Sequence, residues 1–338
     1  MSDDDMDVAR LAVTAALADA DSGLAYRLVL DLMSDGVPMA TVIDEVLAPI
    51  QREAGRRWEA GEVTISEEHA ATTAIETLIA MLAGAFEQPV DADLIVVACA
   101  EGETHTLPAR MAAALLAYEG YHTVFLGTSV PAEDLAGYLA AADATALVVS
   151  CTRTANLLGA RACIAAAHRV GVPVVVGGRA FGDDDRIATR LGADARVGRL
   201  PELVDILQTW DPDPVASEGA AAQVPDEVEA LLAHRVDAAS ALRAAATERL
   251  ATDPIATKVV AQAAEELVDT LAASSYLDDA SVLAAHARWV CGLAAQRGGG
   301  SVEPEHVLAA LAHATEDRAP AVAAFAVAAA GAGPAAPT

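Results

Sequence analysis

Apolar residues recur at helical spacing along residues 7–86 and predict four consecutive helices. The third carries Val42, Val46 and Ile50 at this spacing. Thr64 begins the fourth, with Glu67 three residues later as a capping box. A short turn joins the third helix to the fourth, so residues near that turn are expected to share one end of a four-helix bundle.

The pattern changes after residue 92, where short apolar runs alternate with Ala- and Leu-rich helical segments. Near-continuous apolar runs are typical of parallel strands that are buried on both faces. We therefore predict a doubly wound sheet with flavodoxin-like strand order. Its five strands are expected at residues 93–100, 123–127, 146–152, 173–178 and 195–197.

A Pro-, Ala- and Asp-rich stretch separates this region from the C-terminal part of the chain. Four or five helices are predicted after it. In helix count and length they are similar to sensor globins, although no motif fixes that assignment. The predicted fold class is thus α/β plus all-α. Its parts are an N-terminal bundle (1–88), a sheet domain (89–210), a linker (211–225) and a helical module (226–330) that is globin-like in helix count.

The chain is 54% hydrophobic but only 4% aromatic, and its formal charge is −28. Lys258 is the single lysine. Because phosphate binding relies on lysine and arginine, this balance argues against direct nucleic-acid binding. No apolar run is long enough to span a membrane, and the acidic start does not resemble a signal peptide. We expect a cytoplasmic protein.

Three polar signals fall at the predicted carboxyl ends of strands, where open α/β sheets bind ligands. Glu103-Thr104-His105 follows the first strand and offers an imidazole with a carboxylate that can orient its other ring nitrogen. Ser150-Cys151-Thr152 ends the third strand, and Gly177-Gly178 ends the fourth. Hydroxyls that can bind an aromatic base, beside glycines that admit a bulky group, suggest a slot for a long organic tail.

These motifs and their intervals resemble the cobalamin-binding domain that holds the corrinoid base-off and His-on. The family pattern is Asp-x-His-x-x-Gly, then Ser-x-Leu, then Gly-Gly, and Leu126-Gly127-x-x-Val130-Pro131 fits its second strand-to-helix turn. Three positions depart from it: Glu103 replaces Asp, Pro108 replaces Gly and Thr152 replaces Leu. The alternative is another doubly wound domain with a solvent-exposed loop histidine.

The resemblance implies that His105 is the lower axial ligand of cobalt and that the dimethylbenzimidazole tail is buried between the strand ends. It names a set of cofactor-binding residues in the sheet domain: Glu103, His105, Thr106, Leu107, Gly127, Val130, Ser150, Thr152, Gly177 and Gly178.

In the bundle, Trp58 is followed after nine residues by Glu68-His69. This spacing resembles the adenosylcobalamin-dependent photoreceptors, known from light-responsive transcriptional repressors. The resemblance implies that Trp58 covers the 5′-deoxyadenosyl group and that Glu68 hydrogen-bonds it. His69 would ligate cobalt from above after photolysis. The competing interpretation is a core tryptophan at a helix end and a surface histidine in a first turn.

The C-terminal module places His286, Trp289, Cys291 and His306 in or near amphipathic helices, and all four are candidate residues for a second chromophore. The whole-chain layout resembles the photocobilins, which implies biliverdin in residues 226–330. A thioether from Cys291 is one option, and a buried structural thiol is the other. A dimerisation or docking bundle, or haem on His286 or His306, are the alternatives for the module.

The sequence therefore predicts an adenosylcobalamin light sensor rather than an enzyme. Because it begins at the bundle, without the basic DNA-binding domain of the repressors, its output is expected to pass through the C-terminal helices to an unknown downstream protein. We also expect a homo-oligomer. The alternatives are a corrinoid shuttle for methyl transfer and a scaffold that senses cofactor level without photochemistry.

Overall fold

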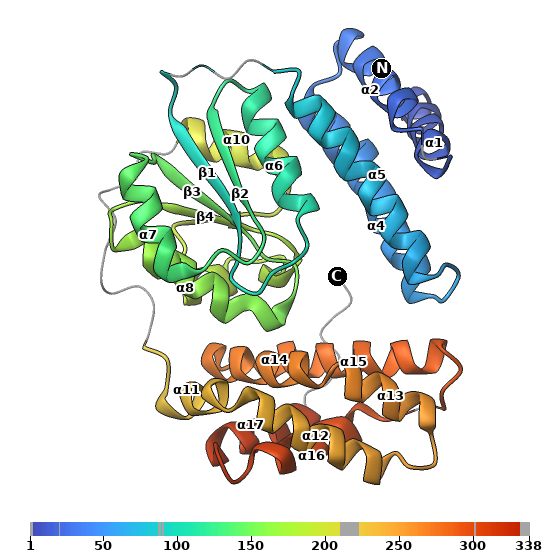
Figure 1. Cartoon of the computed structure of the whole chain (residues 1–338), viewed down its shortest axis with the longest axis vertical. Coiled ribbons are helices and arrows are strands. Elements are labelled where there is room, and N and C mark those ends of the chain that lie inside the picture. Colours follow the sequence, from blue (N-terminus) through green and yellow to red (C-terminus); the bar gives the residue numbers. More distant parts are fainter. Residues whose placement is uncertain are drawn as a thin grey trace. The chain divides into compact units, whose positions relative to one another are not determined.

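The structure is a computed structural model that describes residues 3–19, 21–86, 89, 91–209, 223–300 and 302–331 (Figure 1). The chain divides into two compact units. The first comprises Met1–Thr152 and Gly159–Ala221, and the second comprises Arg153–Leu158 and Ala222–Thr338. The predicted bundle and sheet domain thus form one unit, and most of the predicted linker 211–225 lies outside the described residues.

The N-terminal bundle has the four predicted helices, the third of which is built from three consecutive segments. Asp21 caps the second helix by accepting a hydrogen bond from the Leu24 N–H at 2.8 Å. The bounds are α1 (Asp3–Ala18), α2 (Ser22–Ser34), α3 (Met39–Thr41), η1 (Val42–Leu47), α4 (Ala48–Glu59) and α5 (Ile65–Ala83).

The segment η1 is a π-helix, which the sequence did not predict. Here the Ala48 N–H donates to the Ile43 carbonyl, one residue further back than in an α-helix. The apolar side chains Val42, Ile43, Val46 and Leu47 are all fully buried. Their i, i+4 spacing also fits an α-helix, so the pattern of apolar positions alone does not reveal the wider turn.

Helix α5 begins as predicted, with a complete capping box. The Glu67 N–H donates to the Thr64 hydroxyl at 3.2 Å, and the Glu67 carboxylate accepts from the Thr64 N–H at 2.7 Å. The buried residues of α5 begin only at Ala74, so its first two turns project beyond the bundle core. Helix α4, which runs beside it, has no fully buried residue (Figure 1). The α4–α5 hairpin therefore extends away from the core that anchors it.

The sheet domain has the predicted five parallel strands in the order β2-β1-β3-β4-β5, which confirms the flavodoxin-like topology (Figure 1). Each predicted strand is present within two residues of its expected ends. The strands are β1 (Leu94–Cys99), β2 (His122–Gly127), β3 (Ala146–Ser150), β4 (Val174–Gly177) and β5 (Ala195–Val197). The intervening helices are α6 (Leu107–Tyr118), α7 (Ala132–Ala141), η2 (Thr154–Asn156), α8 (Leu157–His168), η3 (Arg179–Phe181), α9 (Arg186–Leu191) and α10 (Leu200–Thr209).

Helix α6 joins the bundle to the sheet. One of its faces packs on β1 and β3 through Ala109, Ala112 and Leu116. Another carries Leu107, Met111 and Leu115 into the bundle core. Because one helix belongs to both cores, the bundle and the sheet have a defined relative position within the first unit.

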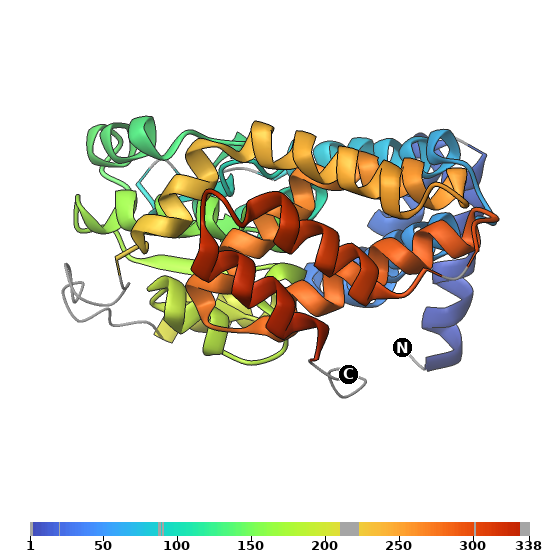
Figure 2. The ribbon, with the colours of Figure 1, turned by 90° about the horizontal axis from the view of Figure 1, so that it is seen from below.

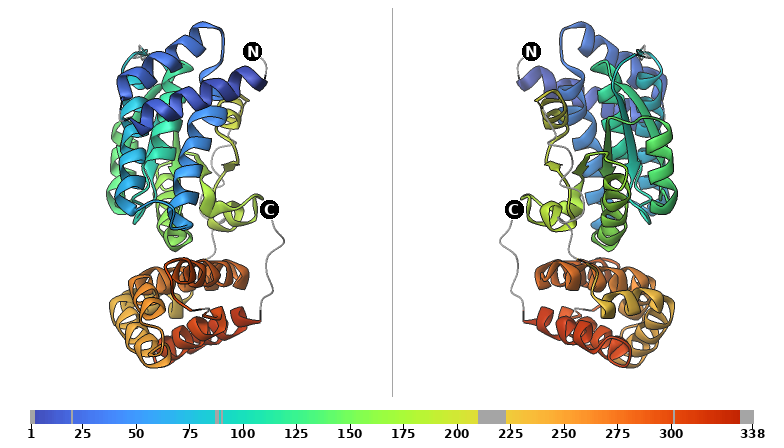
Figure 3. Two further views of the ribbon diagram at one scale, coloured as in Figure 1. Left: turned by 90° about the vertical axis from the view of Figure 1, so that its right-hand side faces the viewer. Right: turned by 90° about the vertical axis from the view of Figure 1, so that its left-hand side faces the viewer.

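The second unit is helical, and Figures 2 and 3 show its helices stacked on one another. Two breaks were not predicted: His234 separates α11 from α12, and Ala263 separates α13 from α14. Asp253 and Asp279 cap α13 and α15. The helices are α11 (Asp226–Ala233), α12 (Arg235–Arg249), α13 (Pro254–Gln262), α14 (Ala264–Leu277), α15 (Ala280–Gln296), α16 (Pro304–Thr315) and α17 (Pro320–Ala330).

The globin-like character of this unit stays a prediction. Within the described part of the chain, every helix is too short or too polar to cross a lipid bilayer.

Replacing Thr64 with Ala should lower the free energy of unfolding by about 1 kcal/mol, because the change removes the hydroxyl that accepts from the Glu67 N–H and donates to the Glu67 carboxylate. Urea denaturation measures the loss. Thr77→Ala is the matched control, since the Thr77 hydroxyl only bonds the Thr73 carbonyl of its own helix. An equal effect of the two substitutions would contradict the role of the cap.

Candidate cobalamin site

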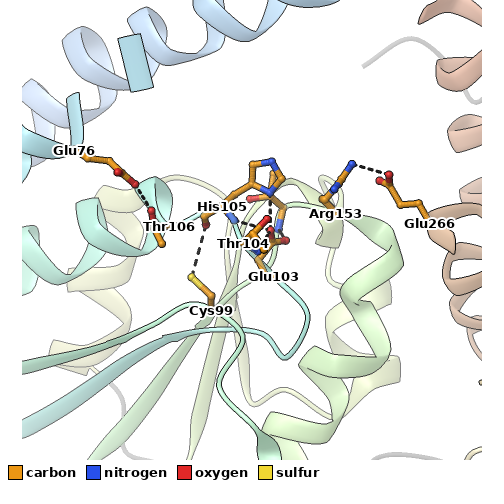
Figure 4. Close-up of polar contacts among 9 residues, drawn as sticks. Glu76, Cys99, Glu103, Thr104, His105, Thr106, Arg153 and Glu266 are labelled. Carbon is orange, nitrogen blue, oxygen red and sulfur yellow. Dashed lines mark hydrogen bonds and ion pairs between the residues drawn. The ribbon is translucent and has the colours of Figure 1, made fainter. Parts of the chain in front are cut away.

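A fully buried carboxylate organises the loop after β1. Glu103 Oε1 accepts hydrogen bonds from the backbone N–H groups of Thr104 and His105, both at 2.9 Å. Its other oxygen, Oε2, accepts from the Thr152 N–H at 2.8 Å. Glu103 thus fixes its own loop and joins it to the end of β3, 49 residues further along the chain (Figure 4).

The same carboxylate sets the orientation of His105. The His105 Nδ1 lies 2.6 Å from Glu103 Oε1, and 48% of the imidazole side chain is exposed. Because a carboxylate accepts, it favours the neutral tautomer in which Nδ1 carries the proton and Nε2 keeps the lone pair that a metal ion requires. The structure therefore brings Glu103 and His105 together as the sequence predicted, with a ligand nitrogen available on the outer side of the ring.

The predicted tail-binding residues gather at the carboxyl ends of adjacent strands. Ser150 pairs in register with Cys99 of β1 and Gly177 of β4. The hydroxyl oxygens of Ser150 and Thr152 are buried and have no hydrogen-bond partner among the described residues. Buried hydroxyls normally find partners, so two unsatisfied ones at one sheet edge indicate a site for a polar ligand.

Gly178 cannot be replaced by a larger residue without moving the backbone. Its φ angle is +110°, and a Cβ atom there would lie 2.3 Å from the Cys151 carbonyl oxygen. A Cβ on Gly177 would lie 2.7 Å from Val197 Cγ1. The paired glycines let the turn after β4 approach Cys151, which follows β3, and Val197 of β5 closely.

The other predicted residues of the sheet domain lie around the same edge. Gly127 ends β2 with a φ angle of +94°, where the pairing with β1 is irregular. Val130 directly precedes the N-cap of α7. Leu107 begins α6 and is 3% exposed, packed in the bundle core.

The predicted upper-face residues lie on the projecting α4–α5 hairpin. Trp58 is in the last turn of α4 and is half-buried. Glu68 and His69 are in the first turns of α5, with Glu68 Oε2 3.7 Å from His69 Nε2. Glu68 is 18% exposed and His69 70% exposed, so the carboxylate is held against the hairpin while the imidazole faces outward.

Three residues that the sequence interpretation missed complete this polar surface. Thr72 donates to Glu68 Oε1 at 2.8 Å, and Gln51 of α4 donates to Thr72 at 2.9 Å. One turn further along α5, Glu76 accepts a hydrogen bond from the Thr106 hydroxyl, beside His105 (Figure 4). The signal was present as a polar residue at every fourth position: Glu68, Thr72 and Glu76.

A cleft of about 560 Å³ lies elsewhere in the first unit, and none of the predicted site residues lines it. Its walls combine both signs of charge, including Arg10, Asp44 and Arg199. The Arg199 Nε donates to Asp44 Oδ2 at 3.0 Å, which ties the start of α10 to η1. We assign this cleft to the junction of bundle and sheet rather than to a ligand site.

In the second unit, the structure brings together two of the four predicted chromophore residues. The rings of His286 and Trp289 stack with centroids 5.6 Å apart and planes 23° apart. The His286 Nε2 is buried without a hydrogen-bond partner among the described residues, as are the hydroxyls of Thr270 and Ser274 on α14. His306 is exposed on α16.

Cys291 is buried, and burial raises the pKa of its thiol to about 11. A thiol that stays protonated is a poor nucleophile, which supports the buried structural role over a thioether. Arg153, which belongs to the second unit, forms an ion pair with Glu266 of α14 at 2.6 Å (Figure 4).

Comparison with known families agrees with this geometry. Residues 94–207 match the B12 binding domain, and residues 11–83 match a second family with the same description. These two stretches of the chain are therefore similar to B12 binding domains. The boundary between the two matches falls between α5 and β1, where the bundle ends and the sheet domain begins.

Among curated proteins, the chain is similar to the HTH-type transcriptional repressor CarH of Myxococcus xanthus. The two are 32% identical over 168 residues, which cover 48% of this chain and 55% of that protein. The chain thus spans about half the length of this relative.

Among solved structures, the chain is similar to the monomethylamine corrinoid protein of Methanosarcina barkeri. The identity is 22% and the TM-score 0.49, over 58% of this chain and 94% of the other. A cobalamin-binding protein from Desulfitobacterium hafniense DCB-2 is also 22% identical. Its TM-score is 0.33, over 60% of this chain and 98% of that one.

The residues at the sheet edge fit cobalamin on physical grounds. The exposed Nε2 of His105 offers one metal ligand, and cobalamin supplies the equatorial ring of nitrogens itself. The unsatisfied hydroxyls of Ser150 and Thr152 offer partners to a polar tail.

Replacing Glu103 with Ala should destabilise the first unit by about 3 kcal/mol, because the N–H groups of Thr104, His105 and Thr152 lose their common acceptor. Urea denaturation of the apoprotein measures the loss. Glu101→Ala, on an exposed residue of the same loop, should be neutral. A loss below about 1 kcal/mol for Glu103→Ala would contradict the structural role of this carboxylate.

Burial lowers the pKa of His286 from 6.5 to about 4. The unfolded chain therefore binds this proton first, so the stability that His286 contributes is present at neutral pH and is lost as the pH falls from about 6.5 to about 4. The loss amounts to about 3 kcal/mol. Asp269 has the opposite effect on the pH dependence of stability. Burial raises its pKa to about 6, so its contribution to stability increases as the pH falls.

Comparing the wild type with His286→Phe isolates the histidine, since Asp269 is common to both. Urea denaturation at about pH 7 and about pH 4 should show the wild type losing about 3 kcal/mol relative to the variant. A difference that is independent of pH would show that His286 titrates normally.

Proposed function

We propose that this protein is a light sensor that binds adenosylcobalamin at the edge of the sheet, beneath the α4–α5 hairpin. The observation that carries the proposal is the Glu103–His105 pair, in which a buried carboxylate holds an exposed imidazole with Nε2 free to bind. In this proposal His105 is the lower axial ligand, and Ser150 and Thr152 hold the tail. The role is that of a signalling protein and not of an enzyme.

When bound, adenosylcobalamin supplies a weak cobalt–carbon bond that visible light can break. The chain's own residues exclude water, hold the adenosyl group and respond to its loss. Trp58 covers the group from α4, and Glu68 accepts a hydrogen bond from it. His69, exposed beside Glu68, would be the imidazole that ligates cobalt from above after illumination.

Two observations support light sensing over a methyl-transfer shuttle. A shuttle has to present its upper face to a methyltransferase, whereas this hairpin carries an aromatic residue and a Glu-His pair. The curated relative is a transcriptional repressor, and the Trp58–His69 spacing resembles that of the light-responsive repressors. The alternative function is a corrinoid shuttle for methyl transfer. The third candidate function is a sensor of cofactor level without photochemistry.

The test is an absorption spectrum of the protein reconstituted with adenosylcobalamin in the dark and then exposed to green light. We expect an alkylcobalamin spectrum that light changes irreversibly into that of a bis-histidine complex. His69→Ala should bleach without forming that final spectrum, because the upper ligand is missing. His313→Ala, on an exposed histidine of the second unit, is the matched control.

Methyl transfer from methylcobalamin to or from a methyltransferase, without any response to light, would instead establish the shuttle. Cofactor uptake with neither response would favour the sensor of cofactor level.

For the second unit we propose a relay module that binds a bilin such as biliverdin near His286 and Trp289. The unsatisfied groups of Thr270, Ser274 and His286 support a polar ligand there. We propose further that the protein is a cytoplasmic homo-oligomer that signals to another protein. A dimerisation bundle without a chromophore, or a haem module using His286 or His306, remain the competing assignments.

Biliverdin added to the apoprotein should give a red-shifted, protein-bound absorption band, and His286→Phe should weaken it by removing the polar nitrogen from the site. Size-exclusion chromatography with absorption detection measures retention of the pigment. His313→Phe, on an exposed histidine of the same unit that is not a candidate chromophore residue, is the control. Retention of haem, or of no pigment, would contradict the bilin assignment.

A further inference from the structure

Helix α5 changes its surroundings just before Glu76, where Ala74 and Ile75 are its first buried residues. Before this point, between Ile65 and Thr73, none of its side chains is fully buried. After it, Leu78, Ile79 and Leu82 pack in the bundle core, which includes α6. Glu76 therefore lies where the anchored half of the helix meets the projecting half that carries Glu68 and His69.

At this position Glu76 contacts the loop that carries His105. Thr106 is the N-cap residue of α6, but its hydroxyl does not cap that helix. It donates instead to Glu76 Oε1 (Figure 4). The side chain of an N-cap threonine normally accepts a hydrogen bond from a backbone N–H in the first turn of its own helix. The Thr106 hydroxyl makes no such bond and instead contacts the bundle.

Arg110, one turn into α6, reinforces the contact. Its Nε lies 3.8 Å from Glu76 Oε1, and its guanidinium stacks over the Phe125 ring at 5.0 Å. The Arg110 Nε is buried and makes no hydrogen bond within the described part of the chain. Glu76 is the carboxylate that pairs with this guanidinium, so Thr106 and Arg110 of α6 both contact the same side chain of α5.

The His105–Thr106 loop is thus held from two sides by two carboxylates. Glu103 holds the imidazole from within the sheet domain, and Glu76 holds the next residue from the bundle. His69 lies seven residues before Glu76 on α5, which corresponds to about 10 Å along the helix. The two contacts therefore connect the loop that carries His105, the predicted lower ligand, to the helix that carries His69, the predicted upper ligand.

We propose that Glu76 is a positioning residue. It determines the position of the projecting half of α5 relative to the loop that carries His105. This proposal rests on the proposed function, since it concerns the same site. The hydrogen bond from Thr106 fixes the position of α5 at Glu76. In the projecting half of α5, the Gln51–Thr72–Glu68 hydrogen bonds keep the helix aligned with α4. Glu76 thereby determines how readily His69 reaches its place after illumination.

The first test uses the apoprotein and needs no cofactor. Amide hydrogen exchange of residues 65–73 should rise about tenfold in Glu76→Ala, because one hydrogen bond to a charged group is lost at this position. Thr106→Val should give the same rise, and Thr106→Ser, which keeps the hydroxyl, should restore the wild-type rate. Thr77→Val is the control on the neighbouring residue of α5.

The two contacts should also behave as one interaction. In a double-mutant cycle, Glu76→Ala combined with Thr106→Val should raise exchange no further than either single change. Additive effects would mean that the residues act separately, and unchanged exchange in both single variants would overturn the proposal. Circular dichroism of each variant checks that the fold is retained.

The second test follows the cofactor-loaded protein after light. Formation of the bis-histidine spectrum should be about tenfold slower in Glu76→Ala, because an untethered helix populates the productive position less often. Glu76→Gln keeps an acceptor for Thr106 and should fall between the two. A wild type that does not respond to light refutes the proposed function. A responsive wild type with an equally fast Glu76→Ala variant refutes the role of Glu76 alone.

Discussion

The candidate site depends on one buried carboxylate. Glu103 is fully buried, and its two oxygens accept from three backbone N–H groups and from the imidazole of His105. Burying a charge is unfavourable unless hydrogen bonds replace its lost hydration, and here they do so within one loop and the neighbouring strand end. The same bonds that make the charge tolerable also determine which nitrogen of His105 faces outward.

This constraint explains the shape of the sheet edge. The Thr152 N–H is committed to Glu103, so the chain after β3 leaves the sheet at a fixed point. The close approach of Gly178 to the Cys151 carbonyl then brings the β4 turn against the same segment. On the other side, α6 begins directly after His105 and Thr106 and enters both the sheet core and the bundle core. Helix α6, which follows this loop, therefore positions the bundle relative to the loop.

The sequence predicted the strands and the His105 loop well because both depend on local signals. Parallel strands that are buried on both faces are continuous apolar runs. The contact between Glu103 and His105 joins residues only two positions apart in one loop. The π-helix of Val42–Leu47 was missed because its apolar spacing fits an α-helix equally well. The break at Ala263 was missed because alanine does not interrupt a helical pattern.

The contact of Glu76 with Thr106 depends on how α5 packs against α6, which no single segment encodes. In the second unit, the sequence predicted the helices except for the breaks at His234 and Ala263. It named His286 and Trp289 as candidate residues, but no motif identifies their ligand. The sequence thus predicted which strand ends lie together in the first unit, and the role of their residues as ligands stays a prediction. The contact between Glu76 and Thr106 required the structure.

The most direct measurement of the central claim is electron paramagnetic resonance of the protein loaded with cob(II)alamin, after labelling its histidines with ¹⁵N. If the His105 imidazole binds cobalt, each cobalt line should split into a doublet in the labelled protein and a triplet in unlabelled protein. The doublet should disappear in His105→Ala. Triplets that persist in the labelled wild type would mean that the cofactor's own base still occupies the lower position, which would contradict the account.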